Sequence, residues 1–260
     1  MSSLVDDLRL AHVLADQADA ITTARFKALD LKVDRKPDMT PVSDADLAVE
    51  DALRSTLSRS RPRDAVLGEE RGETGFGPRR WVIDPIDGTK NFVRGVPVWA
   101  TLIALMEDKE VLAGVVTAPA LNRRWWASKG NGAWTGRSLS SGTQIHVSEV
   151  AWVLDASVSY SSLDGWVEIG RGQQFVDLLQ DCWRSRAFGD FWSYMLVAEG
   201  AVDIAAEPEL ELHDMAAPAI IVTEAGGRFT SIDGDPGPFG PGALATTPAL
   251  HSEILARLTE

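Results

Sequence analysis

The sequence predicts an α/β (α+β) protein, and three observations along the chain support this. Apolar residues recur at helical spacing in the first part, short runs rich in β-branched and aromatic residues fill the middle, and helical and strand-like patterns alternate towards the end. No repeat with a long period, low-complexity block or long linker interrupts this order. We therefore expect helices packed against extended sheet.

Two amphipathic helices are expected first. From about Leu4 to Leu29, apolar residues such as Leu8 and Ala11 recur at helical spacing. The second helix begins at Ser43-Asp44-Ala45-Asp46, which resembles a capping box with acids in the first turn, and runs to about Ser60.

The middle of the chain is predicted to form strands, and the last part to form helices with a further strand. The expected strands are Trp81–Ile83, Thr101–Met106, Val111–Thr117, Trp125–Ser128, Val153–Ser159 and Val202–Ala206. The expected helices are Gln173–Trp183, Phe191–Glu199 and Met215–Glu224, the last closed by Gly226-Gly227. The Gly/Pro-rich stretch Asp233–Gly242 is predicted to be a surface loop.

Composition limits the partners that the protein can have. The chain has 260 residues, enough for one large domain or two closely joined lobes. Its formal net charge of −13 disfavours nucleic acid and anionic membranes, so a small molecule is the expected partner. The N-terminus has neither a basic region nor a continuous apolar stretch, and we expect a cytoplasmic protein.

The lone cysteine, Cys182, excludes an intrachain disulfide. It follows an apolar pattern with Phe175, Leu178, Leu179 and Trp183 that predicts one buried helix face. A buried thiol of this kind is expected to be inert.

The strongest chemical signal is Asp84-Pro85-Ile86-Asp87-Gly88-Thr89, which directly follows the apolar strand Trp81–Ile83. Two carboxylates this close repel one another, and a bound cation is the simplest reason to keep both charged. Oxygen ligands without a Cys or His cluster favour Mg²⁺ over zinc. Gly88 permits a tight turn, after which the amides of Gly88 and Thr89 can bind a phosphate. The alternative is a turn in which both acids cap the next helix.

Residues 84–92 match the signature Asp-Pro-x-Asp-Gly-Thr-x-Asn-Phe, and this resembles the inositol-monophosphatase-like sugar phosphatases. Further elements of that family occur in the same order: Ser43-Asp44, Gly68-Glu69-Glu70, Asp214-Met215-Ala216-Ala217 and Glu224-Ala225-Gly226-Gly227. The resemblance implies the layered α-β-α-β-α sandwich of inositol monophosphatase and fructose-1,6-bisphosphatase. It also implies an N-terminal α+β lobe over residues 1–145, a C-terminal α/β lobe over residues 146–260, and a homodimer.

The resemblance further implies a role for each matching residue. Two or three Mg²⁺ ions would be held by Glu69, Asp84, Asp87 and Asp214, by the carbonyl of Ile86 and, more weakly, by Asp44. Thr89 would pair with Asp44 and orient the attacking water, with Glu69 also catalytic, and the Gly88 and Thr89 amides would bind phosphate oxygens. Cations remove the repulsion between an anionic ester and hydroxide, so this arrangement is typical of phosphomonoester hydrolysis by direct water attack.

Several of the flanking acids have a structural interpretation as well as a functional one. Asp44 and Asp214 each lie where an acid commonly caps a helix, and Asp46 is expected to point elsewhere and complete the cap. Glu70 is either an outer support for the site or a solvated charge. His213 replaces a tryptophan that often precedes the family's last metal ligand, and it can contact substrate, carry a proton or pack.

The run Lys90–Leu105 resembles the histidinol-phosphatase branch of the family, with Arg94 where inositol phosphatases commonly have His. The substrate implied is histidinol phosphate, whose ammonium group would need carboxylates, and Asp190 and Glu207 are the candidates. Inositol phosphate or another sugar phosphate is the alternative, since Glu207 matches an acid near sugar hydroxyls. Asp190 can instead cap a helix.

Two weaker possibilities remain open. The aromatic residues Trp99, Tyr160 and Trp192 can stack on an imidazole or pack in the core. A metal-binding regulatory protein that has lost catalysis would show a missing ligand, and every acid of the family cluster is present.

Overall fold

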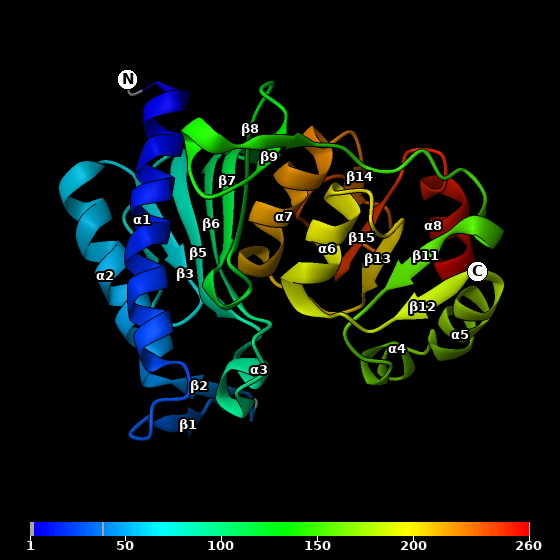
Figure 1. Ribbon diagram of the computed structural model, residues 1–260, viewed down its shortest axis with the longest axis horizontal. Helices are drawn as coiled ribbons and strands as arrows, with labels where there is room; N and C mark the ends of the chain where they lie inside the picture. The colour runs from blue at the N-terminus through cyan, green and yellow to red at the C-terminus, as the bar shows by residue number, and fades with distance from the viewer. Residues whose placement is uncertain (1–2, 38, 260) are drawn as a thin grey trace.

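The computed structural model describes residues 3–37 and 39–259. It contains a large sheet and a smaller sheet, arranged with helices in five layers (Figure 1). The helices are α1 (Leu4–Arg25), α2 (Asp44–Ser60), α3 (Thr89–Arg94), α4 (Asp164–Glu168), α5 (Gly172–Asp181), α6 (Asp190–Ala198), α7 (Leu212–Glu224) and α8 (His251–Thr259). Short 3₁₀ helices are η1 (Pro119–Leu121), η2 (Leu139–Ser141) and η3 (Val153–Asp155).

The larger sheet is eight-stranded and mostly antiparallel. In spatial order its strands are β10 (Thr143–Ile145), β9 (Ala133–Thr135), β8 (Arg123–Ser128), β7 (Glu110–Ala118), β6 (Ala100–Glu107), β5 (Arg79–Asp87), β3 (Ala65–Gly68) and β4 (Gly72–Thr74). A separate hairpin is formed by β1 (Val33–Arg35) and β2 (Pro41–Ser43).

The smaller sheet is five-stranded and mixed. Its spatial order is β12 (Arg184–Arg186), β11 (Ser157–Ser159), β13 (Ile204–Glu207), β15 (Ala243–Thr246) and β14 (Arg228–Thr230). The second strand in this order, β11, runs parallel to both β12 and β13, so these three strands end at the same edge.

The alternation of side chains along the strands creates the layers. On β5, Ile83 packs with α1 and α2 on the outer face, whereas Val82 faces the other way into a core shared with α6 and α7. On β13, Ala205 belongs to this shared core and Ala206 packs towards α4, α5 and α8. The order is therefore α-β-α-β-α, which confirms the predicted fold.

The shared core also bears on the predicted lobes. The larger sheet ends at Ile145 and the smaller one begins at Ser157, which brackets the predicted boundary between residues 1–145 and 146–260. However, α7 packs against β7 and β8 of the larger sheet. The division into two lobes at this boundary stays a prediction.

Most predicted elements are present, and two differ. Val153–Ser159 is a strand only from Ser157, because η3 occupies the residues before it. The helix predicted to reach Trp183 ends at Asp181, so Cys182 is buried beyond the helix and Trp183 is 68% exposed. The prediction of a buried Trp183 was wrong. None of the described helices is long and apolar enough to cross a membrane.

Candidate metal centre and active site

An irregularity in β5 explains how Asp84 and Asp87 come to share a face. Residues three apart on a regular strand point to opposite faces of the sheet. The pairing of β5 with β6 changes register here, since Asp84 lies opposite Leu102 and Asp87 opposite Ala100. One extra residue is thus accommodated on β5, as in a β-bulge, and both carboxylates can turn towards α7.

Asp214 reaches the same place from the first turn of α7. Its Oδ2 accepts a hydrogen bond of 2.7 Å from the backbone N–H of Glu211, which fixes the carboxylate at the start of the helix. The predicted capping role of Asp214 is therefore present together with its place in the cluster. His213 lies beside it, with 3.7 Å between His213 Nε2 and Asp214 Oδ1.

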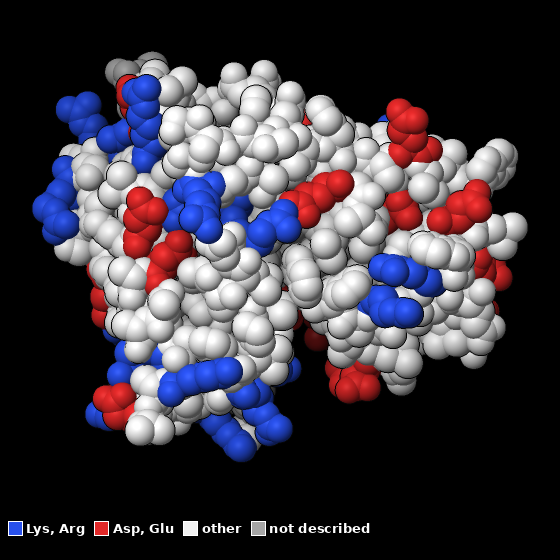
Figure 2. Space-filling view, in the orientation of Figure 1, with Lys and Arg blue, Asp and Glu red and all other residues white. Residues whose placement is uncertain are grey.

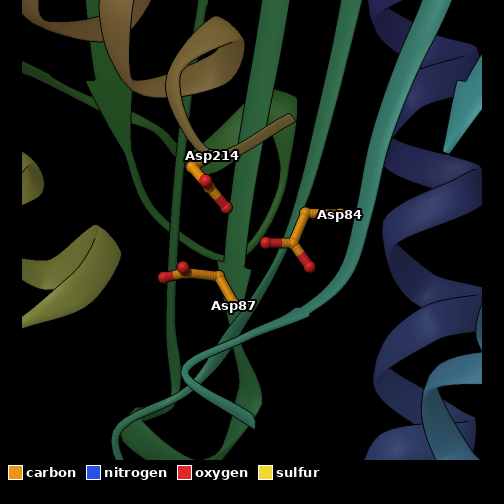
Figure 3. Close-up of side chains that lie close together, drawn as sticks. All are labelled: Asp84, Asp87 and Asp214. Carbon is orange, nitrogen blue, oxygen red and sulfur yellow. The ribbon is translucent and has the colours of Figure 1, made fainter. Parts of the chain in front are cut away.

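The three acids form one cluster. Each of Asp84, Asp87 and Asp214 offers a carboxylate oxygen, and these oxygens lie within 4.8 Å of one another. Figure 3 shows the carboxylates of Asp84, from β5, and Asp214, from α7, turned towards one another, with Asp87 close below them. This spacing suits a shared cation, because like charges this close repel strongly without one.

Glu69 borders the cluster at the end of β3. A Cβ atom at Gly68 would lie 2.2 Å from the Glu50 carboxylate, so only glycine fits there. Glu50 in turn accepts a hydrogen bond of 2.7 Å from the Glu70 N–H, which fixes the turn carrying both glutamates. The Lys36 ammonium lies 2.6 Å from Glu69 and 2.7 Å from Glu70. Lys36 lies in the β1–β2 hairpin, and no sequence pattern indicated its place at the site.

The predicted pairing of Thr89 with Asp44 was wrong. The Thr89 hydroxyl lies 3.4 Å from Asp46 Oδ1 and donates to the Ile86 carbonyl at 2.8 Å, whereas Asp44 forms an ion pair of 2.8 Å with Arg25. Positions 44 and 46 are about 200° apart around a helix, so only one of them can face Thr89. Asp46 is fully buried there and also completes the cap as predicted, through Ser43.

Gly88 has φ of 81°, a left-handed conformation that turns the chain from β5 into α3. A Cβ atom at this position would lie 3.0 Å from the Val98 carbonyl and 3.2 Å from the Asp190 carboxylate. Gly88 and Thr89 line the adjoining pocket, where we predicted their amides to bind phosphate.

Burial and mutual repulsion raise the pKa values of the acids in the cluster. Burial first and Glu69 second raise the pKa of Asp84 well above its ordinary value, and burial and Asp190 do the same for the pKa of Asp87. Asp84 Oδ1 is buried and accepts no hydrogen bond from the described residues. An orphaned carboxylate oxygen among other acids fits a metal ligand.

A pocket of about 810 Å³ opens beside the cluster. Predicted site residues on its wall are Glu69, Gly88, Thr89, Asp190, His213 and Asp214. Glu207 is buried near them, because its charge contributes to the raised pKa of Asp87. The pocket therefore joins a candidate metal centre to a second acidic region, formed by Asp190 and Glu207.

The cluster fits a hard divalent cation. All the candidate ligands are oxygens, and neither histidine nor cysteine belongs to the cluster within the part of the chain that is described. The Ile86 carbonyl accepts one hydrogen bond from Thr89 and retains a lone pair for a metal.

The aromatic candidates pack in the core. Trp99 is buried against Phe92, with ring centroids 5.1 Å apart. Tyr160 meets the edge of Phe175, and Trp192 lies against Phe188. These contacts favour core packing for all three residues.

Comparison with known proteins agrees with this fold. Residues 6–260 match the inositol monophosphatase family, and the chain belongs to that family. It is 64% identical to a histidinol-phosphatase of Streptomyces coelicolor, over 100% of this chain and 99% of that one. It is 58% identical to a histidinol-phosphatase of Mycobacterium tuberculosis, over 97% and 98%. The structure of an inositol monophosphatase from Zymomonas mobilis has a TM-score of 0.86 and 32% identity, with both chains fully covered.

Proposed function

We propose that this protein hydrolyses L-histidinol phosphate to L-histidinol and phosphate, a step of histidine biosynthesis, with Mg²⁺ as cofactor. The observation that carries the reaction type is the cluster of Asp84, Asp87 and Asp214 beside the pocket lined by Gly88 and Thr89. The substrate is supported by the relatives at 64% and 58% identity, both named histidinol-phosphatase.

Two or three Mg²⁺ ions would be held by the acids at the end of β5 and their neighbours. The proposed ligands are Glu69, Asp84, Asp87, Asp214 and the Ile86 carbonyl. Asp44 is not among these ligands, because Asp46 occupies the place beside Thr89 and Asp44 pairs with Arg25. When bound, such ions neutralise the phosphate ester and acidify water.

Residues of the chain would position the attacking water and the phosphate group. Thr89 lies between Asp46 and the Ile86 carbonyl, which suits a hydroxyl that positions water. Glu69 borders the same space and is the proposed base. Gly88 and Thr89 line the pocket, and their amides would bind phosphate oxygens.

The second acidic region would bind the rest of the substrate. Asp190 and Glu207 supply carboxylates for an ammonium group, and His213 lies on the pocket wall where it can contact the imidazole. The alternative substrate is inositol 1-phosphate or a related sugar phosphate, which the likeness to the Zymomonas mobilis inositol monophosphatase favours.

Magnesium-dependent release of inorganic phosphate tests the reaction type. We expect release from histidinol phosphate with Mg²⁺, none after chelation, and none with Asp87→Asn. Asp108→Asn, which changes an exposed acid in the turn between β6 and β7, is the matched control and should behave as the unaltered protein. Release from no phosphate monoester would instead support a metal-binding regulatory protein.

We also propose a homodimer, supported by an apolar surface beside the edge strand β12. Trp152, Leu154 and Trp183 are 72%, 76% and 68% exposed, and they lie around the start of β11 and β12. Large apolar side chains gathered in this way mark interaction sites. Sedimentation of Trp183→Glu should give monomers, and a dimer of unchanged affinity would rule out this surface.

A further inference from the structure

The two acids proposed to bind the substrate's ammonium group are brought together by the parallel part of the smaller sheet. Glu207 is the last residue of β13, and Asp190 follows β12 through a short loop. Between these strands lies β11, and the chain leaving it reaches Ser161. Because the three strands are parallel, the segments after them meet at one edge.

Ser161 connects the two acids. Its Oγ accepts a hydrogen bond of 2.9 Å from the Asp190 N–H. The hydroxyl has a single hydrogen, which remains available to donate. Glu207 lies close enough to interact with it, since burial and Asp190 raise the pKa of Glu207 to about 8 and Ser161 opposes this rise.

Asp190 is held from its other side as well. Its Oδ2 accepts a hydrogen bond of 3.0 Å from the Asn91 side chain on α3. Its backbone has φ of 49°, which is left-handed and uncommon for a residue other than glycine. Strain of this kind persists where surrounding contacts impose it, and here those contacts include Ser161 and Asn91.

Glu207 retains capacity for a ligand. Its side chain is buried, and Oε1 has no hydrogen-bond partner among the residues that are described. A buried carboxylate with one oxygen supported and one unpartnered is ready to accept a hydrogen bond from a cation.

We propose that Ser161 is a specificity-determining positioning residue, which holds Asp190 and Glu207 at the spacing that one substrate ammonium group can bridge. This inference rests on the proposed function. It assigns Ser161 no contact with the phosphate or with the metal ligands, so its effect is on binding of the amine end of the substrate.

The test compares two substrates, L-histidinol phosphate and its N-acetyl derivative, which has a neutral amide in place of the ammonium. Ser161→Ala should raise KM for histidinol phosphate by about tenfold with kcat nearly unchanged, since a hydrogen bond to a charged group is lost. For the N-acetyl derivative the variant and the unaltered protein should have the same KM. Ser161→Thr retains the hydroxyl and should restore the lower KM for histidinol phosphate.

Ser162→Ala is the matched control, because Ser162 is an exposed neighbouring serine. An equal rise in KM for both substrates, an unchanged KM in Ser161→Ala, or a failure of folded Ser161→Thr to restore binding would each overturn the inference. Failure of the unaltered protein to hydrolyse histidinol phosphate would instead contradict the proposed function and remove the basis of this inference. If the unaltered protein hydrolyses histidinol phosphate and Ser161→Ala has the same KM, only the role of Ser161 is overturned and the proposed function stands.

Discussion

Asp84→Asn should make the metal-free protein more stable while removing its response to Mg²⁺. The carboxylate oxygens of Asp84, Asp87 and Asp214 lie within 4.8 Å of one another, and each pair of charges at that separation repels by about 3.5 kcal/mol at an effective dielectric constant of about 20. Asparagine keeps the shape of Asp84 and removes its charge. Allowing for relaxation and proton uptake, we expect a gain of about 2 kcal/mol in the free energy of unfolding.

Thermal unfolding with chelator and with Mg²⁺ measures both effects. A gain of this size raises Tm of the metal-free protein by roughly 4 to 8 °C for a protein of this size class. In the unaltered protein, Mg²⁺ at about 100 times its Kd adds about 2.7 kcal/mol, and most of this increment should be lost in Asp84→Asn. Asp108→Asn, in the exposed turn between β6 and β7, is the control and should change neither value. A lower metal-free Tm in Asp84→Asn, or an intact response to Mg²⁺, would refute the reasoning.

Three further results are expected. Asp46→Asn should lower kcat/KM by about 100-fold and Asp44→Asn by less than about threefold, because only Asp46 lies against Thr89; equal losses would contradict this assignment. Burial and Arg228 lower the pKa of His251 to about 4, so below pH 6.5 the unfolded chain binds a proton that the folded one excludes. The free energy of unfolding, measured with urea, should therefore fall as the pH drops from 6.5 towards 4. His251→Gln should reduce the slope of this free energy against pH by up to about 1.4 kcal/mol per pH unit, and an unchanged slope would contradict the prediction. Trp183→Glu should raise the dimer dissociation constant, measured by sedimentation, because it places a charge on the exposed apolar surface.

The parts of the site that depend on local sequence could be predicted. Asp84 and Asp87 follow a buried strand, and the glycine after them requires a turn, so the position of both acids at the end of β5 follows from neighbouring residues. Their common orientation could not be predicted, because it depends on an irregular pairing with β6. The metal-ligand role of Asp214 could be predicted only from the family resemblance, since nothing near it in sequence distinguishes a metal ligand from a helix cap.

The features of the site that depend on tertiary contacts could not be predicted from the sequence. Asp46 and Asp44 are both acids in one helical turn, and only the packing of α2 against the Thr89 turn decides which of them faces the site. Lys36 meets Glu69 across 33 positions of sequence, so no spacing pattern indicates it. The strand β12, Arg-Ser-Arg, has no apolar run and was not predicted, although it carries the chain to Asp190.

The fold was easier to predict than the site because burial follows periodicity. Alternate residues of β5 and β13 lie in different cores, which is what the strand pattern encodes. The net charge of −13 likewise favoured a small-molecule partner, and the acidic pocket agrees with a metal and a cationic substrate. Figure 2 shows both acidic and basic side chains on the face in view, with most of the basic ones over the half that contains α1 and α2.

The most direct test of the proposed function is the ratio of kcat/KM values with Mg²⁺ for histidinol phosphate and for inositol 1-phosphate. We predict that histidinol phosphate is preferred by at least about tenfold, which corresponds to about 1.4 kcal/mol of transition-state discrimination. Fructose 1,6-bisphosphate and adenosine 3′,5′-bisphosphate in the same assay should also be poorer substrates. Equal or better hydrolysis of inositol 1-phosphate would contradict the assignment of Asp190 and Glu207 to an ammonium group.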